Sequence, residues 1–432
     1  MWQAFAPRQL LLHCSTKLHP CNDAKPAYMP SMAISVRSRS EAETTAEGWS
    51  AGRGRSPSNH RVENRNVYEI SEEGWPRRSC CGSLSTETTP QSRKKTINRV
   101  AHLLIGVILL AGCEQQPHLV EQRILQFGTV IDVSLVHHDL AKAEQTLIEI
   151  EQLLSAYRQS WHAWEDSDLS RFNLALLGSS GAVTVPASLL ELITLSQRYY
   201  LSSNRLFNPA LGKLIAAYGF HGQADIDEEL IKLIQQDLPT MADLEIQGRL
   251  AISRNPHLQL DFGGIAKGYA IGLIASHLDR LGFEHYLINA GGDLITSGNR
   301  LGKAWRIGVK NPFEPGAIAS IDLLGKQALF TSGNYQRFYL NNDKTVHHII
   351  DPRSGEPSKH ISSATVLTSD PVLADVAATT LMIDGLNNYR SLAGSLGIED
   401  YMIIDDQQRI TISGSLAGKI ELSAGLMVTI VD

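Results

Sequence analysis

Residues 113–432 alternate between two patterns of apolar and polar positions, one with the period of a helix and one with the period of a strand. The helical pattern covers 140–154, 186–200, 225–238 and 373–383, and strand-like runs include 124–136, YLINAGGDLITSG, AWRIGVK and SSATVLTS. Most of these strands follow one another through tight turns. We therefore expect an α+β fold with antiparallel sheets packed with helices, and not a doubly wound parallel sheet.

The stretch LQLDFGGIAKGYAIGLIASHLDRLGF, residues 258–283, joins a predicted strand to a predicted helix through two glycines. Gly263 and Gly264 allow backbone conformations that other residues avoid, and they let a ligand approach the main chain. Amide groups at a helix start also attract phosphate. The spacing matches neither common phosphate-binding fingerprint, so the stretch is either a phosphate-binding loop or a packing turn.

The first part of the chain differs in composition. Residues 1–92 are rich in Ser, Arg, Thr, Glu and Pro without sustained apolar periodicity, and we expect a non-structural upstream extension. Residues 93–112 combine a basic start with an apolar stretch that is too short to span a bilayer, as in a signal peptide. The position of this segment suggests that the translation start has been placed too far upstream.

The signal-like segment ends in Leu-Ala-Gly-Cys, which looks like a bacterial lipobox with Cys113 as the lipidated residue. The other reading is a buried apolar helix with an incidental cysteine. The lipobox predicts a folded domain over 113–432, held at a membrane in the periplasm. All other cysteines lie upstream, so this domain has no pair that could form a disulfide.

The charge balance excludes one class of partner. The formal net charge is −6, and no basic stripe suggests a nucleic-acid surface.

Several segments, taken in order, resemble one bacterial family: the FAD:protein FMN transferases of the ApbE type, formerly called thiamine-biosynthesis lipoproteins. The segments are FGTVIDVSL, SAYR, DSDLSRFN, FNPALGKLIAAYGF, LDFGGIAKGYA, INAGGDL, TSGNYQRF, HHIIDPRSGEP and LADVAATTLMI, over 127–385. The resemblance implies a T-fold-like ApbE architecture. It also implies Mg²⁺-dependent transfer of the FMN half of FAD to a Thr or Ser hydroxyl of an acceptor protein, possibly a membrane redox subunit, with release of AMP. By family, the inner membrane is favoured over the outer.

The resemblance assigns a metal site. Gly264 matches the position whose main-chain carbonyl binds Mg²⁺, and Asp375 and Thr379 match the side-chain ligands. These two are four residues apart and share one face of the predicted helix. From the residues alone, Asp375 could equally be a helix N-terminal acid stabilised by the dipole.

The resemblance also assigns contacts to FAD. They fall on Phe127, Tyr157, Leu206, Phe207, Asn208, Asp261 and Lys267. Tyr157 lies in the stretch 155–173, which we predict to be a polar, aromatic-rich loop. Phe127 could instead fill the core, and Lys267 could be a solvated surface lysine. Asp293 is either a turn residue or a contact of the pocket wall.

A histidine pair raises the question of a second metal. His347, His348 and Asp351 could suggest zinc, but adjacent residues of a strand point to opposite faces, so both histidines cannot easily bind one ion. The resemblance favours His348 as the catalytic residue, which would orient or deprotonate the acceptor hydroxyl.

The chain departs from the family pattern in ways that keep other functions open. QSWHAWE lengthens one loop, Asn208 and Asn334 stand where aspartates are usual, and Ala378 replaces an acid that some members carry. Two alternatives therefore remain: a non-catalytic periplasmic lipoprotein that binds FAD, and an FAD pyrophosphatase that releases FMN and AMP.

Overall fold

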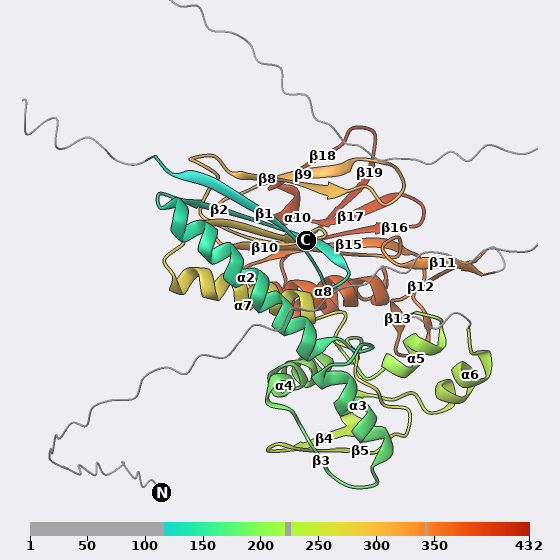
Figure 1. Cartoon of the computed structure of the whole chain (residues 1–432). Helices are drawn as coiled ribbons and strands as arrows, with labels where there is room; N and C mark the ends of the chain where they lie inside the picture. Colours follow the sequence, from blue (N-terminus) through green and yellow to red (C-terminus); the bar gives the residue numbers. More distant parts are fainter. Residues whose placement is uncertain (1–115, 221–225, 342–343) are drawn as a thin grey trace, which may run out of the picture. The chain divides into compact units, whose positions relative to one another are not determined.

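The computed structural model describes residues 116–220, 226–341 and 344–432 (Figure 1). The chain divides into two units, Met1–Pro90 and Gln91–Asp432, and every described residue belongs to the second. The predicted upstream extension, the signal peptide and Cys113 lie outside the described residues. In the described part, no helix is both long enough and apolar enough to cross a bilayer.

A nine-stranded sheet forms the centre of the domain (Figure 1). Its order is β1 (His118–Gln126), β2 (Thr129–His137), β6 (His285–Ala290), β7 (Asp293–Ser297), β10 (Gln327–Gly333), β15 (Ile361–Thr368), β16 (Asp400–Asp405), β17 (Arg409–Ser413) and β19 (Met427–Val431). Every neighbouring pair is antiparallel except β17 and β19. The α+β prediction with antiparallel sheets is therefore confirmed.

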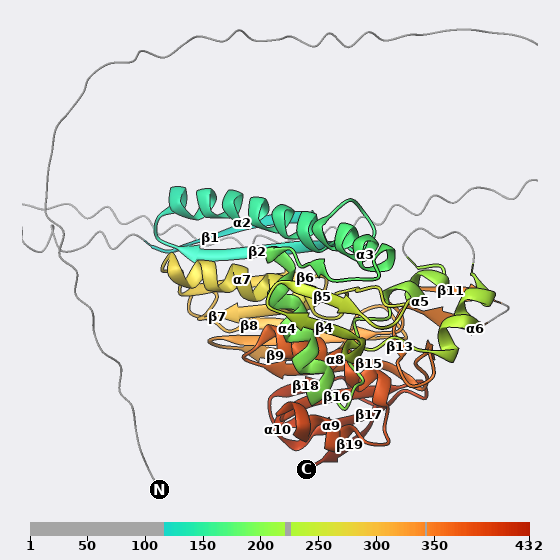
Figure 2. The ribbon, with the colours of Figure 1, turned by 90° about the horizontal axis from the view of Figure 1, so that it is seen from below.

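The two faces of this sheet have different covers (Figures 1 and 2). Helices cover one face: α2 (Leu140–Trp161), α7 (Ala266–Arg280), α8 (Pro371–Asp384) and α9 (Tyr389–Leu396). The other face packs on a three-stranded sheet of β8 (Trp305–Lys310), β9 (Ala317–Leu323) and β18 (Ile420–Leu422), with the short α10 (Gly414–Ala417). Side chains alternate between the two cores, so that in β16 Ile403 faces the helices while Met402 and Ile404 face the small sheet.

A further group of elements extends beyond the helical face (Figure 1). It contains α3 (Asp168–Gly178), α4 (Ala187–Ser202), α5 (Gly212–Ala217), α6 (Glu228–Gln236), the 3-10 turn η1 (Met241–Asp243) and a small sheet of β3 (Val183–Thr184), β4 (Leu244–Gln247) and β5 (Leu250–Ser253). Two separate hairpins complete the domain: β11 (Phe338–Asn341) with β12 (Lys344–His347), and β13 (Ile350–Asp351) with β14 (Glu356–Pro357).

Three predictions of secondary structure were wrong. The run 124–136 is not one strand but a hairpin, because Phe127 and Gly128 both take positive φ and reverse the chain between β1 and β2. The stretch 155–173 is mostly helical: α2 continues through Trp161, whose side chain is buried, and α3 begins at Asp168. The segment before the glycine loop joins no sheet, although Leu258, Leu260 and Phe262 are all buried, as their alternation predicted.

Helices α7 and α8 touch at Gly268. A Cβ at this position would lie 2.3 Å from the Pro371 carbonyl oxygen and 2.9 Å from the Asp375 Cβ, distances that no side chain tolerates. The glycine therefore lets the start of α7 lie directly against the first two turns of α8. This contact fixes the two segments that carry most of the candidate metal and phosphate residues.

Candidate active site

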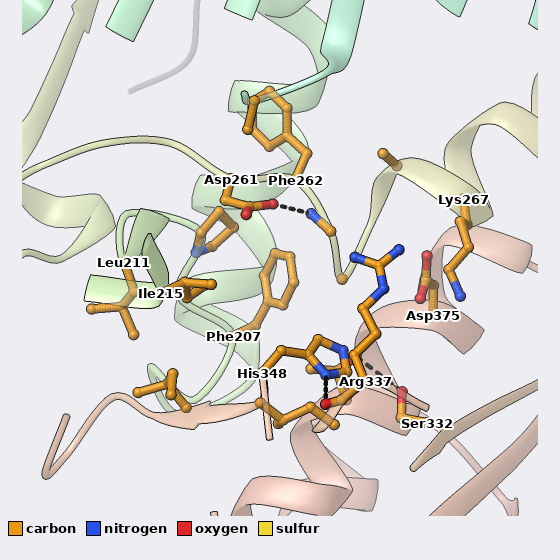
Figure 3. A pocket seen from close by; sticks show the side chains of 18 of the residues that line it. Phe207, Leu211, Ile215, Asp261, Phe262, Lys267, Ser332, Arg337, His348 and Asp375 are labelled. Carbon is orange, nitrogen blue, oxygen red and sulfur yellow. Dashed lines mark hydrogen bonds between the residues drawn. The ribbon is translucent and has the colours of Figure 1, made fainter. Parts of the chain in front are cut away.

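Most of the predicted site residues line one cavity of about 380 Å³ (Figure 3). Its wall includes the metal candidates Gly264, Asp375 and Thr379, the catalytic candidate His348, and the FAD candidates Phe127, Leu206, Phe207, Asn208, Asp261 and Lys267. These residues come from segments that are far apart in the sequence. The fold therefore brings together every predicted site residue in the described ranges except Tyr157.

The turn between β1 and β2 forms one edge of the cavity. Phe127 has a φ of 53° and Gly128 a φ of 67°, which is the two-residue turn that matches the twist of a hairpin. The left-handed region costs an aromatic residue free energy, and such strain is often found at functional sites. Phe127 also packs against the large core, so it belongs both to the core and to the cavity wall.

The glycine loop before α7 forms the floor. Asp261 Oδ1 accepts a hydrogen bond of 2.7 Å from the Gly263 amide, which closes the turn. A Cβ on Gly264 would lie 3.4 Å from both Phe207 Cε2 and Thr379 Oγ1, so the main chain passes close to both side chains. The loop thus exposes backbone to the cavity beside the Thr379 hydroxyl.

Helix α8 presents Asp375 and Thr379 to this loop. The helix terminus is capped by Asp370, whose carboxylate accepts from the Val372 and Leu373 amides, so Asp375 is not needed as a helix-end acid. Asp375 is only 3% exposed, and its Oδ2 accepts a 2.9 Å hydrogen bond from the Gly268 amide. Thr379 Oγ1 lies 3.2 Å from Ser332 Oγ.

These groups form a site of oxygen donors: a buried carboxylate, two hydroxyls and a nearby main-chain segment. Hard cations such as Mg²⁺ prefer oxygen ligands, and Mg²⁺ commonly takes only one or two carboxylates besides phosphate and water. The residues therefore fit Mg²⁺. Within the described ranges no cluster of three or more His, Cys, Asp or Glu side chains is suited to a metal, which gives no support to the zinc alternative.

Lys267 is partly buried between two carboxylates. Its ammonium forms an ion pair with Asp293, which also accepts a 3.0 Å hydrogen bond from the Thr331 amide. Burial lowers the pKa of Lys267 and raises the pKa of Asp375, while the attraction between these two charges opposes both shifts. Lys267 is therefore no solvated surface lysine, and Asp293 is the buried partner that holds it rather than part of the cavity wall.

The two histidines lie in different surroundings, as expected for neighbours at the end of a strand. His347 is buried and its Nε2 lies 2.8 Å from the Ser358 carbonyl oxygen. His348 lines the cavity, and its Nδ1 lies 3.3 Å from the Arg337 carbonyl oxygen (Figure 3). Because a carbonyl only accepts, Nδ1 carries the proton and the lone pair is on Nε2.

The His348 imidazole is neutral at physiological pH. Burial, together with the positive charge of Arg337, lowers the pKa of His348 to about 4. A neutral imidazole with a free lone pair can accept a proton from a hydroxyl group.

Tyr157 does not reach the cavity, because it lies on the helical part of α2 and not on a loop. Its ring stacks on Trp161, with centroids 4.7 Å apart and planes 8° from parallel. Trp161 lines the cavity instead and donates through Nε1 to the Ser188 carbonyl oxygen at 2.9 Å. His162, Ala163 and Trp164 also line it, so the lengthened loop forms part of the wall.

Two asparagines that replace family aspartates make hydrogen bonds that an ionised aspartate could not. Asn208 donates to the Pro239 carbonyl oxygen at 2.8 Å, and Asn334 donates to the Ile361 carbonyl oxygen at 3.2 Å. A carboxylate has no proton to donate to either oxygen. These replacements therefore fit their local backbone.

The sequence analysis gave no role to several polar side chains of the cavity wall. Ser332 lies in β10, Gln336 and Arg337 follow that strand, and Arg158 lies on α2. All except Arg158 stand in the segment TSGNYQRF, whose resemblance to the family was noted without a role for its side chains. The place of TSGNYQRF in the order of the family motifs was the signal that could have identified Ser332, Gln336 and Arg337 as site residues.

Comparisons with known proteins identify the family of this chain. The ApbE family model matches residues 127–402. The chain is 28% identical over 363 residues to an FAD:protein FMN transferase of Rhodobacter capsulatus, covering 82% of this chain and 69% of that protein. It is 29% identical over 311 residues to an FAD:protein FMN transferase of Vibrio cholerae, covering 70% and 92%.

Solved structures give the same result. The flavin transferase ApbE of Vibrio cholerae matches with a TM-score of 0.61 and 26% identity, over 70% of this chain and 99% of that one. The ApbE protein of Thermotoga maritima, at 24% identity and a TM-score of 0.62, has the same fold. The expected ApbE architecture is therefore confirmed, and this chain is an enzyme of the ApbE family.

Proposed function

We propose that this protein transfers the FMN half of FAD to a threonine or serine hydroxyl of an acceptor protein and releases AMP. The observation that carries the proposal is the convergence on one cavity of a neutral histidine, an oxygen-donor metal site and a glycine loop. The family relationship supports the choice of FAD as substrate.

The apolar part of the cavity wall suits the flavin. Phe127, Leu206, Phe207 and Trp161 offer aromatic and aliphatic surfaces, and an isoalloxazine ring gains from stacking on such rings. Asp261 and Asn208 add polar groups on the same wall, which can orient the ring through hydrogen bonds.

Asp375, Thr379 and the Gly264 carbonyl would hold Mg²⁺. Such an ion would supply positive charge to offset the negative charge on the diphosphate. Lys267 lies beside Asp375 and adds a positive charge to the same region. The contact of Gly268 with Asp375 keeps this group in place before any substrate arrives.

His348 accepts the proton of the acceptor hydroxyl on Nε2. The hydroxyl oxygen attacks the phosphorus of the FMN half, a new P–O bond forms, and the P–O bond to the AMP phosphate breaks. AMP leaves with the electron pair of that bond, and the acceptor keeps FMN as a phosphodiester. Atoms and charges balance without an oxidant or reductant.

The direct test is an incubation of the purified protein with FAD, Mg²⁺ and a candidate acceptor, followed by intact mass measurement. We expect the acceptor mass to rise by one FMN and AMP to appear in equal amount. Release of FMN and AMP with an unmodified acceptor would support a pyrophosphatase instead. Tight FAD binding without either product would support a non-catalytic flavin carrier.

We also propose that Cys113 carries a lipid that anchors the domain to a membrane facing the periplasm, and the family resemblance favours the inner membrane over the outer. The support is the signal-like segment 93–112 and its lipobox-like end.

Changing Cys113 to Ser should move the protein from the membrane fraction to the soluble periplasmic fraction, because acyl chains supply the membrane affinity. Fractionation followed by immunoblotting checks this. Thermal unfolding of the released protein should stay the same, since the residue precedes β1. Membrane attachment that survives the substitution would contradict the lipoprotein assignment.

A further inference from the structure

Arg337 lies at the open end of the β11–β12 hairpin, beside the catalytic candidate His348. It is the residue before β11, while His348 is the residue after β12, and the last register pair of the hairpin is Phe338 with His347. The contact of His348 Nδ1 with the Arg337 carbonyl oxygen extends this pairing by one step. The Arg337 backbone is therefore fixed relative to the imidazole.

The Arg337 guanidinium lies against the turn at Phe127 and Gly128. A Cβ on Gly128 would lie 3.4 Å from Arg337 Nη2, so the absence of a side chain leaves room for the planar group. In Figure 3 the Arg337 side chain extends from His348 toward the space between Asp261 and Lys267. The guanidinium therefore borders the cavity, where the Arg337 side chain remains accessible to solvent.

The positive charge of Arg337 has no ionic partner among the residues that the structure describes. Among residues 116–220, 226–341 and 344–432, no side chain forms an ion pair or hydrogen bond with its guanidinium. The other cations of the wall have partners, since Lys267 pairs with Asp293 and Arg158 with Glu165. The charge of Arg337 also lowers the pKa of Lys267 and His348, so all three groups share one region.

We propose that Arg337 binds a phosphate of the flavin nucleotide and makes the site select phosphorylated flavins over riboflavin. The inference rests on the proposed function, because it takes a flavin nucleotide as the ligand. A guanidinium presents a planar fork of donors that matches two phosphate oxygens, whereas the Lys267 ammonium acts as a point charge. The two cations would then hold the diphosphate from different segments.

The test compares dissociation constants of riboflavin, FMN and FAD for the wild type and Arg337→Gln, by flavin fluorescence in Mg²⁺ buffer without acceptor. We expect the constants for FMN and FAD to rise about 10- to 100-fold, as for loss of a charged hydrogen-bonding pair. The constant for riboflavin should stay within about twofold. Arg337→Lys should recover part of the phosphate preference.

Arg158→Gln is the matched control, because it removes an arginine of the same wall that already has a carboxylate partner. It should leave the ratio of FMN affinity to riboflavin affinity within about twofold of the wild type. Thermal unfolding of each variant checks that folding is intact, which we expect since the Arg337 side chain is exposed.

Two results would overturn the inference alone: unchanged FMN and FAD binding by Arg337→Gln, or an equal loss for all three flavins. If flavin binding is unchanged but the KM for the acceptor rises, Arg337 recognises a carboxylate of the acceptor instead. A wild-type protein that binds none of the three flavins would overturn the proposed function together with this inference.

Discussion

Replacing Asp375 by Ala should lower the rate of FMN transfer by about a hundredfold or more, on the order of 3 kcal/mol of transition-state stabilisation. Asp375 supplies the charged ligand among the oxygen donors of the proposed metal site, and its carboxylate is buried at the α7–α8 contact. FAD affinity should fall much less, because the residues proposed to contact the flavin do not include this carboxylate. The measurement is the transfer rate as a function of Mg²⁺ concentration.

Two companion variants separate charge from structure. Asp375→Asn keeps an oxygen that can accept from the Gly268 amide but removes the negative charge, so its rate should fall nearly as far as that of Asp375→Ala. Thr379→Val should cost less, since a neutral hydroxyl is the weaker ligand. A normal rate and an unchanged Mg²⁺ dependence in Asp375→Ala would show that the site has been assigned to the wrong residues.

Replacing His348 by Gln should lower kcat by about 10²- to 10⁴-fold, the usual contribution of a positioned general base. Its pKa is lowered to about 4, so the imidazole accepts a proton at any pH above that value. The wild-type rate should therefore stay high as the pH falls through 6.5, and should decline only near pH 4. A pH–rate profile of transfer with a saturating acceptor measures this limb.

His347→Gln is the control for this prediction. His347 is buried and contacts the Ser358 carbonyl oxygen, so its loss should lower thermal stability and leave the acid limb of the profile in place. If His348→Gln transfers FMN at the wild-type rate, the base is another group. If the wild-type acid limb lies near pH 6.5, burial does not control the imidazole as described.

The fold class could be predicted from the sequence because it depends on local periodicity. The helix predicted at 373–383 became α8 with small changes at its ends, and the tight turns between strands correctly indicated antiparallel pairing. The hairpin at Phe127 was missed because an aromatic residue with positive φ is uncommon, so the run was interpreted as one strand. The end of α2 was missed because its polar composition concealed the buried Trp161.

The candidate site was predicted less from chemistry than from motif order. Asp375 and Thr379 could be placed on one helical face from their spacing, but the Gly264 loop meets that face only through the crossing of α7 and α8. No local pattern in the sequence predicts such a contact between distant segments. The sequence could not show that Arg337 has no ionic partner among the described residues, because ion pairing depends on how the chain folds.

The β11–β12 hairpin has a consequence for how the protein tolerates change. Arg337 and His348 lie at its open end, directly before β11 and directly after β12. The residue pairs from Phe338 with His347 to Asn341 with Lys344 set the distance between these two residues. The hydrogen bonds between paired antiparallel strands hold that separation as long as these four residue pairs are kept, and a longer connection at the far end adds only a small entropic cost. A longer connection between β11 and β12 could therefore evolve to meet a new acceptor without moving Arg337 or His348. A peptide tag could be inserted at the same place.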